Sequence, residues 1–114
     1  MPAVTKNLTI EQKATFRKKM VYRDKFKKPI NLTGFSARMQ IRAADGSLIA
    51  DLSTQNGKII LGGASGSIEL VIPVAETSLM TFTTALYDLK LISPNGDEIR
   101  MLKGKVTLDP GQTQ

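Results

Sequence analysis

The side chains that could do chemistry in this sequence are ten carboxylates, because histidine and cysteine are both absent. The absence of histidine removes the commonest general base and zinc ligand, and the absence of cysteine excludes disulfides, thiolate metal sites and thiol catalysis. Catalysis by paired carboxylates needs two groups that converge in a cleft, and no spacing here predicts such a pair. Asp45 and Asp97 lie in turn sequences, and Glu69 lies on the polar face of a predicted strand. The ten are Glu11, Asp24, Asp45, Asp51, Glu69, Glu76, Asp88, Asp97, Glu98 and Asp109.

No loop has the dense Asp-x-Asp-x-Asp spacing that binds calcium. Gly62-Gly63-Ala64-Ser65-Gly66 could be mistaken for a phosphate-binding loop. A phosphate-binding loop must open a helix whose N-terminus faces the anion, whereas predicted strands flank this segment on both sides. A hairpin loop is therefore the favoured interpretation. We expect no enzymatic activity, no bound metal and no cofactor.

Positive charge is concentrated in one segment of the chain. Residues 1–30 carry nine basic and two acidic side chains, and the remaining residues carry seven basic and eight acidic ones. The candidate partner-binding residues are Arg17, Lys18, Lys19, Arg23, Lys25, Lys27 and Lys28. They could contact an acidic protein surface or nucleic-acid phosphates. The simplest interpretation is a solvated edge strand, since lysines on an edge discourage pairing between sheets.

The elements that must position these side chains are short strands separated by turns. Phe35, Ala37, Met39 and Ile41 alternate with polar residues, which is typical of a strand buried on one face. Asp45-Gly46 is a strong hairpin signal, because glycine adopts positive φ without cost. The predicted strands cover residues 5–10, 13–23, 35–42, 48–52, 58–61, 67–72, 82–92 and 98–108.

Three details of this pattern carry specific predictions. Adjacent apolar residues at Met101 and Leu102, close to Gly104, indicate a β-bulge in the last strand. Residues 74–81 break the alternation and predict one or two helical turns. Tyr87 is interpreted as a buried tyrosine whose hydroxyl bonds to backbone at a corner of the fold.

One alternative remains open near the N-terminus. Residues 9–22 could form an amphipathic helix with a capping box at Thr9 and Gln12, but the alternation favours two strands. Seven to eight short strands with regularly spaced turns predict a single all-β domain over residues 1–114, an antiparallel β-sandwich. The start of the chain lacks the apolar core of a signal peptide, and no apolar run is long enough for a membrane span. We therefore expect a cytoplasmic protein, or a component of a particle assembled there.

Three stretches together resemble small immunoglobulin-like structural proteins of tailed bacteriophages, akin to the N-terminal domain of baseplate upper proteins. Residues 29–42 open with Pro-Ile-Asn-Leu-Thr-Gly-Phe and continue into an arginine-containing strand. Residues 87–96 read Tyr-Asp-Leu-Lys-Leu-Ile-Ser-Pro-Asn-Gly, and residues 100–110 read Arg-Met-Leu-Lys-Gly-Lys-Val-Thr-Leu-Asp-Pro. The resemblance covers roughly residues 29–110, and the order and spacing of its three parts are kept.

The resemblance implies an immunoglobulin-like form of the sandwich and a non-enzymatic virion protein that docks among tail, baseplate or fibre proteins. We expect multiple copies of it within a symmetric particle. The resemblance transfers no set of functional residues, and the basic N-terminal segment departs from the family. Two alternatives remain open: a capsid decoration or head-completion protein, and a small nucleic-acid-binding β domain.

Overall fold

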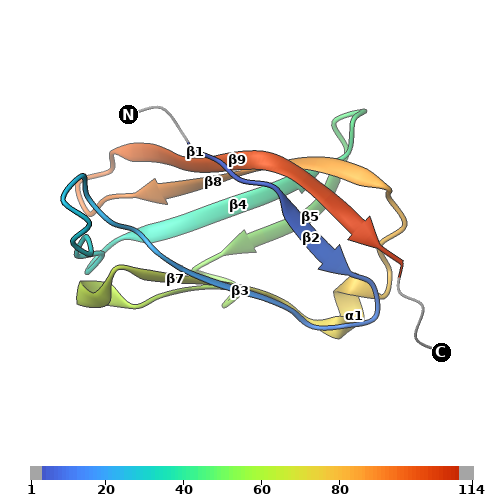
Figure 1. The fold of residues 1–114 in the computed structure, drawn as a ribbon, viewed down its shortest axis with the longest axis horizontal. Coiled ribbons are helices and arrows are strands. Elements are labelled where there is room, and N and C mark those ends of the chain that lie inside the picture. The colour runs from blue at the N-terminus through green and yellow to red at the C-terminus, as the bar shows by residue number, and fades with distance from the viewer. Residues whose placement is uncertain (1–3, 111–114) are drawn as a thin grey trace.

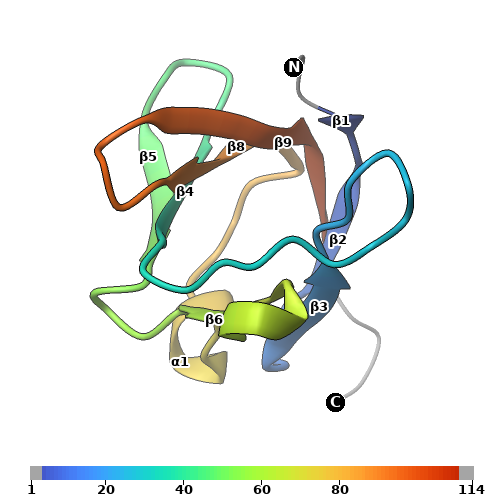
Figure 2. The same ribbon diagram turned by 90° about the vertical axis from the view of Figure 1, so that its left-hand side faces the viewer.

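The computed structural model describes residues 4–110, which form two β-sheets packed face to face (Figure 1). The larger sheet contains β1 (Val4–Thr5), β2 (Leu8–Glu11), β4 (Ser36–Arg42), β5 (Leu48–Ser53), β8 (Thr84–Ile92) and β9 (Glu98–Asp109). The smaller sheet has the order β3 (Phe16–Val21), β7 (Ser67–Ile72) and β6 (Ile59–Leu61). The view along the sandwich in Figure 2 shows the two layers on either side of the core. The predicted immunoglobulin-like sandwich is confirmed.

One pairing differs from the antiparallel prediction. Both β1 and β2 pair in parallel with β9, while all other strand pairs are antiparallel within the described residues. The chain crosses from one sheet to the other between β2 and β3, so β2 uses the outer edge of β9 and β3 pairs with β7. The sequence pattern reports which residues face the core, and it carries no information on strand direction.

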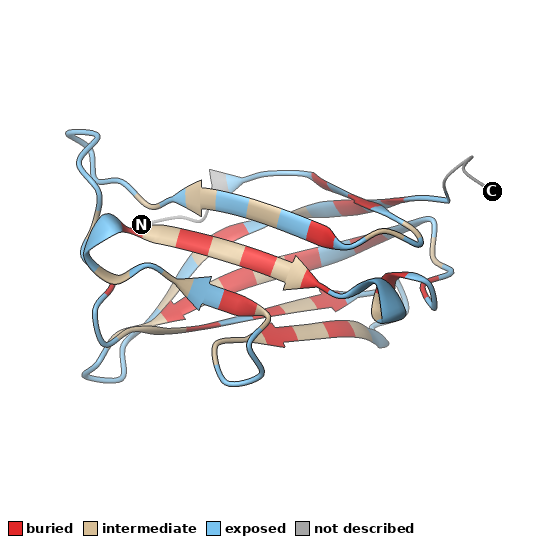
Figure 3. Cartoon of the chain, turned by 90° about the horizontal axis from the view of Figure 1, so that it is seen from below, coloured by how far each residue is buried: buried red, intermediate tan, exposed pale blue. Residues whose placement is uncertain are grey.

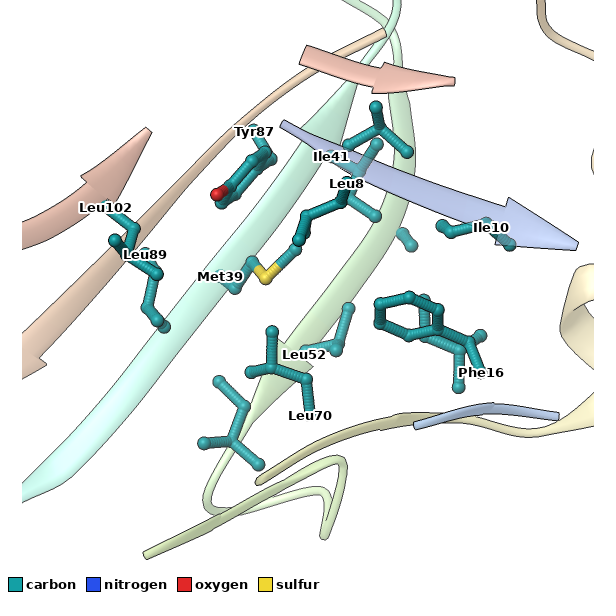
Figure 4. Packing of buried hydrophobic residues seen from close by; sticks show 14 of the residues in the cluster. Leu8, Ile10, Phe16, Met39, Ile41, Leu52, Leu70, Tyr87, Leu89 and Leu102 are labelled. Carbon is teal, nitrogen blue, oxygen red and sulfur yellow. The ribbon is translucent and has the colours of Figure 1, made fainter. Parts of the chain in front are cut away.

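The core is built from the alternating apolar residues of both sheets, as the banding of buried and partly exposed positions in Figure 3 shows. Met39 and Ile41 of β4 and Leu89 of β8 are fully buried from the larger sheet. Ile68 and Leu70 of β7 are fully buried from the smaller sheet. Figure 4 shows side chains of the larger sheet, among them Met39 and Leu89, meeting Leu70 and Phe16 of the smaller sheet between the layers. Burial of this apolar surface supplies the main stabilisation of the fold.

Most predicted elements are present with shifted ends. The two predicted N-terminal strands are found, which excludes the helix over residues 9–22, but the first is divided into β1 and β2. The predicted helical segment is a single turn, α1 (Val74–Thr77). The glycine-rich loop does connect two antiparallel strands, β6 and β7, and it contains one 3₁₀ turn over Gly63–Ser65.

The predicted bulge lies in β9, opposite the step from Leu89 to Lys90. Leu89 pairs with Leu102 and Lys90 with Arg100, so Met101 is the extra residue. The extra residue lets Leu102 point into the core while Arg100 and Lys103 share the outer face.

Candidate protein-binding hairpin

The basic segment divides into a strand and an ordered hairpin that follows it. The hairpin covers residues 22–30 and is closed at its base by backbone hydrogen bonds. Tyr22 N–H donates to the Gly66 carbonyl at 2.8 Å, and Ile30 N–H donates to the Tyr22 carbonyl at 2.9 Å. Arg23 and Pro29 form an antiparallel bridge just beyond these bonds. The hairpin is therefore tied both to the loop between β6 and β7 and to itself.

Asp24 organises the tip of the hairpin. Its Oδ1 accepts hydrogen bonds from the backbone N–H groups of Phe26 at 2.8 Å and Lys28 at 3.0 Å. Lys27 N–H donates to the Asp24 carbonyl at 2.9 Å, and Arg23 Nη1 donates to the Lys27 carbonyl at 3.1 Å. An aspartate that bonds the backbone two residues on is a common turn-forming device. The side chain of the hairpin's one acidic residue is thus bonded to backbone, while its basic residues are exposed.

Phe26 lies at this tip with 70% of its surface exposed. The Lys25 ammonium lies 5.4 Å from the centroid of the Phe26 ring, within the range of a cation–π contact. Arg23, Lys27 and Lys28 are also exposed. The hairpin therefore presents an exposed aromatic ring, with one ammonium group beside it and three further exposed cationic residues, on an ordered backbone.

The three basic residues of β3 do not join this group. Arg17 and Lys19 are exposed on the outer face of the smaller sheet, and Arg17 lies 3.5 Å from Glu69. Lys18 lies on the opposite face, in line with the core residues Phe16 and Met20. Because β3 is an edge strand, an inward-facing lysine at this position opposes pairing with another sheet. The solvated-edge interpretation thus fits residues 17–19.

Phe26 was not singled out from the sequence as a candidate binding residue. The signal that could have identified it is Asp24, two residues before Phe26 and in a stretch without strand alternation. That spacing predicts an ordered turn rather than a solvated tail.

Other kinds of site have little support in residues 4–110. They contain no group of three or more His, Cys, Asp or Glu side chains placed to hold a metal ion. No helix in this range is both long and apolar enough to cross a membrane.

Comparison with known proteins establishes the fold alone. No protein-family model and no curated protein sequence matches the chain. Among solved structures, CopC from Methylosinus trichosporium OB3b is similar over 99% of this chain and 91% of its own, with a TM-score of 0.51 and 13% identity. Extracellular domains 3–5 of Drosophila OTK align at 14% identity and a TM-score of 0.41, and this chain spans 32% of their length. At such identity the CopC likeness says that the chain has a related β-sandwich, and function must be argued from its own surface.

Proposed function

We propose that this chain is a non-enzymatic structural adaptor of a bacteriophage tail or baseplate, and that it binds a neighbouring virion protein through the hairpin at residues 22–30. Support for the phage context comes from the sequence resemblance over residues 29–110. Support for the binding surface comes from one observation: an exposed Phe26 on a backbone held by Asp24, in a hairpin with four exposed basic residues.

An ordered hairpin loses less conformational entropy on binding than a flexible loop does. Aromatic residues at the centre of an interface contribute much of its affinity, and charged residues at the rim steer the approach of an oppositely charged partner. The partner is then an acidic protein surface with an apolar recess for Phe26. Repeated copies in a symmetric particle would multiply such individually weak contacts.

The test is capture of partners by tagged protein from a lysate that contains assembling particles, with the captured proteins identified by mass. Recovery of tail, baseplate or fibre proteins is expected, and Phe26→Ala should reduce their recovery. Leu79→Ala is the matched control, because Leu79 is 81% exposed and follows α1, near the other end of the sandwich from the hairpin (Figure 1). Equal losses in both variants would contradict the role of the hairpin.

The same capture discriminates the other candidate functions. Recovery of the major capsid protein would place the chain on the head as a decoration or completion protein. Retention of nucleic acid that falls steeply between low and moderate salt would favour the nucleic-acid-binding alternative and contradict the adaptor.

A further inference from the structure

A second charged surface lies on the outer face of the larger sheet, away from the hairpin residues. The register of β4, β8 and β9 places Arg38 opposite Lys90, and Lys90 opposite Arg100. Three cations therefore occupy directly adjacent positions on three neighbouring strands. Like charges directly opposite each other in a sheet are destabilising, so this row has a cost to the isolated fold.

The ion pairs on this face offset the repulsion within this row of cations only in part. Arg38 lies 3.5 Å from Asp51, Lys90 lies 3.7 Å from Glu98, and Arg100 lies 3.6 Å from Asp88. These separations are long and the side chains are well exposed, so each pair contributes little to stability.

Further cations on the same face have no acidic partner among the described residues. Lys103, opposite Asp88 in the strand register, makes no ion pair there. Arg42 donates to the Gly46 carbonyl and to Gln40 Oε1, both at 2.9 Å, and its positive charge is not neutralised by either. The face therefore keeps an excess of positive charge.

A shallow hollow of about 620 Å³ lies over this face, and Leu86 lines it together with Arg38, Arg42, Arg100 and Lys103. Leu86 is 61% exposed and lies between Arg42 and Lys105 in the register. An exposed leucine between cations is suited to a partner that offers an apolar group flanked by carboxylates.

We propose that this face, called the sheet face and formed by the outward residues of β4, β8 and β9, binds an acidic segment of another protein. The segment would place an apolar side chain on Leu86 and carboxylates beside Arg38, Arg100 and Lys103. Nucleic acid fits less well. The aromatic ring nearest the hollow, that of Tyr87, is buried at 4% exposure and offers no stacking surface for bases.

The experiment is an NMR titration of the whole chain with three probes. The first is a short peptide with one leucine flanked by glutamates, the second carries glutamines in their place, and the third is single-stranded DNA. The acidic peptide should shift backbone amides of β4, β8 and β9, and the glutamine peptide should bind more weakly. Absence of shifts with the acidic peptide at millimolar concentration, or tighter binding of DNA, would overturn the proposal.

Matched variants locate the binding on the sheet face. Leu86→Ala and Lys103→Gln should each weaken peptide binding by about threefold. Their controls are Ile60→Ala and Lys19→Gln on the smaller sheet, where Ile60 is 49% exposed and Lys19 is exposed on the outer face. Equal weakening by a variant and its control would overturn the assignment. Because the hairpin residues remain intact, this result is independent of the capture experiment.

Discussion

The two edges of the larger sheet end in different ways. At one edge, β1 and β2 cover β9 and continue the backbone ladder. At the other edge, no strand within the described residues pairs with the outer side of β5, and the Asn56 side chain bonds to backbone there instead. Asn56 Nδ2 donates to the Asp51 carbonyl at 2.9 Å, and Asn56 Oδ1 accepts from Ser53 N–H at 3.0 Å. A covering strand needs a close fit along its whole length, whereas a single amide side chain bonds one backbone N–H and one carbonyl at one place on the edge.

The close fit at the covered edge depends on Gly104. A Cβ atom built on Gly104 would lie 2.2 Å from the Lys6 carbonyl oxygen, so only glycine leaves room for the segment between β1 and β2. The Lys6 carbonyl lies over Gly104, on the side of β9 that also carries the buried Leu102 and Val106. Tyr87, opposite Gly104 on β8, donates its hydroxyl to this carbonyl at 2.6 Å. The predicted tyrosine–backbone bond is confirmed, but it joins β8 to the N-terminal segment instead of closing a corner of the fold.

The largest expected effect is that of Gly104→Ala. The new methyl group collides with backbone, which cannot move aside as a flexible side chain would, so we expect a loss of about 3 kcal/mol in the free energy of unfolding. Chemical denaturation measures the loss. Hydrogen exchange should show the amides of β2 losing protection before those of β4.

Gly46→Ala is the control for Gly104→Ala. Gly46 has open space around it and a φ of +89°, so its substitution introduces backbone strain without a collision. If the two variants lose equal stability, the close approach at Gly104 is not what restricts the covered edge.

A smaller effect is expected for Tyr87→Phe. Loss of the hydroxyl removes a part-buried hydrogen bond and leaves the Lys6 carbonyl without this donor, at a cost of about 1–2 kcal/mol. Tyr22→Phe is the control, because Tyr22 is half-buried and the described residues give its hydroxyl no hydrogen bond. A cost for Tyr87→Phe no larger than that of its control would contradict the role of this bond.

The same pair of variants has a signature in alkaline solution. Burial raises the pKa of Tyr87 above its ordinary value of about 10. The folded state holds the Tyr87 proton more tightly than the unfolded state does. The contribution of this group to the free energy of unfolding is therefore complete below the ordinary pKa and is lost as pH rises through the raised pKa. Between about pH 9 and pH 11, wild type should lose more stability than Tyr87→Phe does.

The free edge of β5 should show the smallest loss of stability and a change in association. Asn56→Ala removes the bonds to Asp51 and Ser53 and one to Lys58 N–H, at a cost of about 1 kcal/mol, because these groups can bond to water instead. The exposed edge groups can then pair with another chain. Sedimentation should show concentration-dependent self-association.

Two further variants test the prediction for Asn56→Ala. Gln55→Ala, a neighbouring exposed residue, should stay monomeric. Asn56→Asp keeps the acceptor for Ser53 and Lys58 and loses the donor to Asp51, so its association should be intermediate. A monomeric Asn56→Ala at every concentration would show that β5 needs no such protection.

Much of the fold followed from the sequence, because local chemistry acts over a few residues. Alternation located β4, β7 and β8, and the apolar pair at Met101 and Leu102 located the bulge. The Asp45-Gly46 turn is present, with Ser47 N–H and hydroxyl both donating to Asp45 Oδ1 at 2.9 and 2.7 Å. Each signal depends on contacts made within a single hairpin.

The two candidate binding surfaces could be recognised only from the tertiary structure. The sequence identified a basic run, and the fold separated Lys18, turned toward the core side, from the hairpin that exposes Phe26. The row of Arg38, Lys90 and Arg100 joins residues far apart in the chain, so only the pairing of β4, β8 and β9 could reveal it. Which residues face inward can be predicted from the sequence, since alternation is local. Strand direction, close approaches and shared surfaces follow only from the folded structure, because they are set by contacts between distant segments.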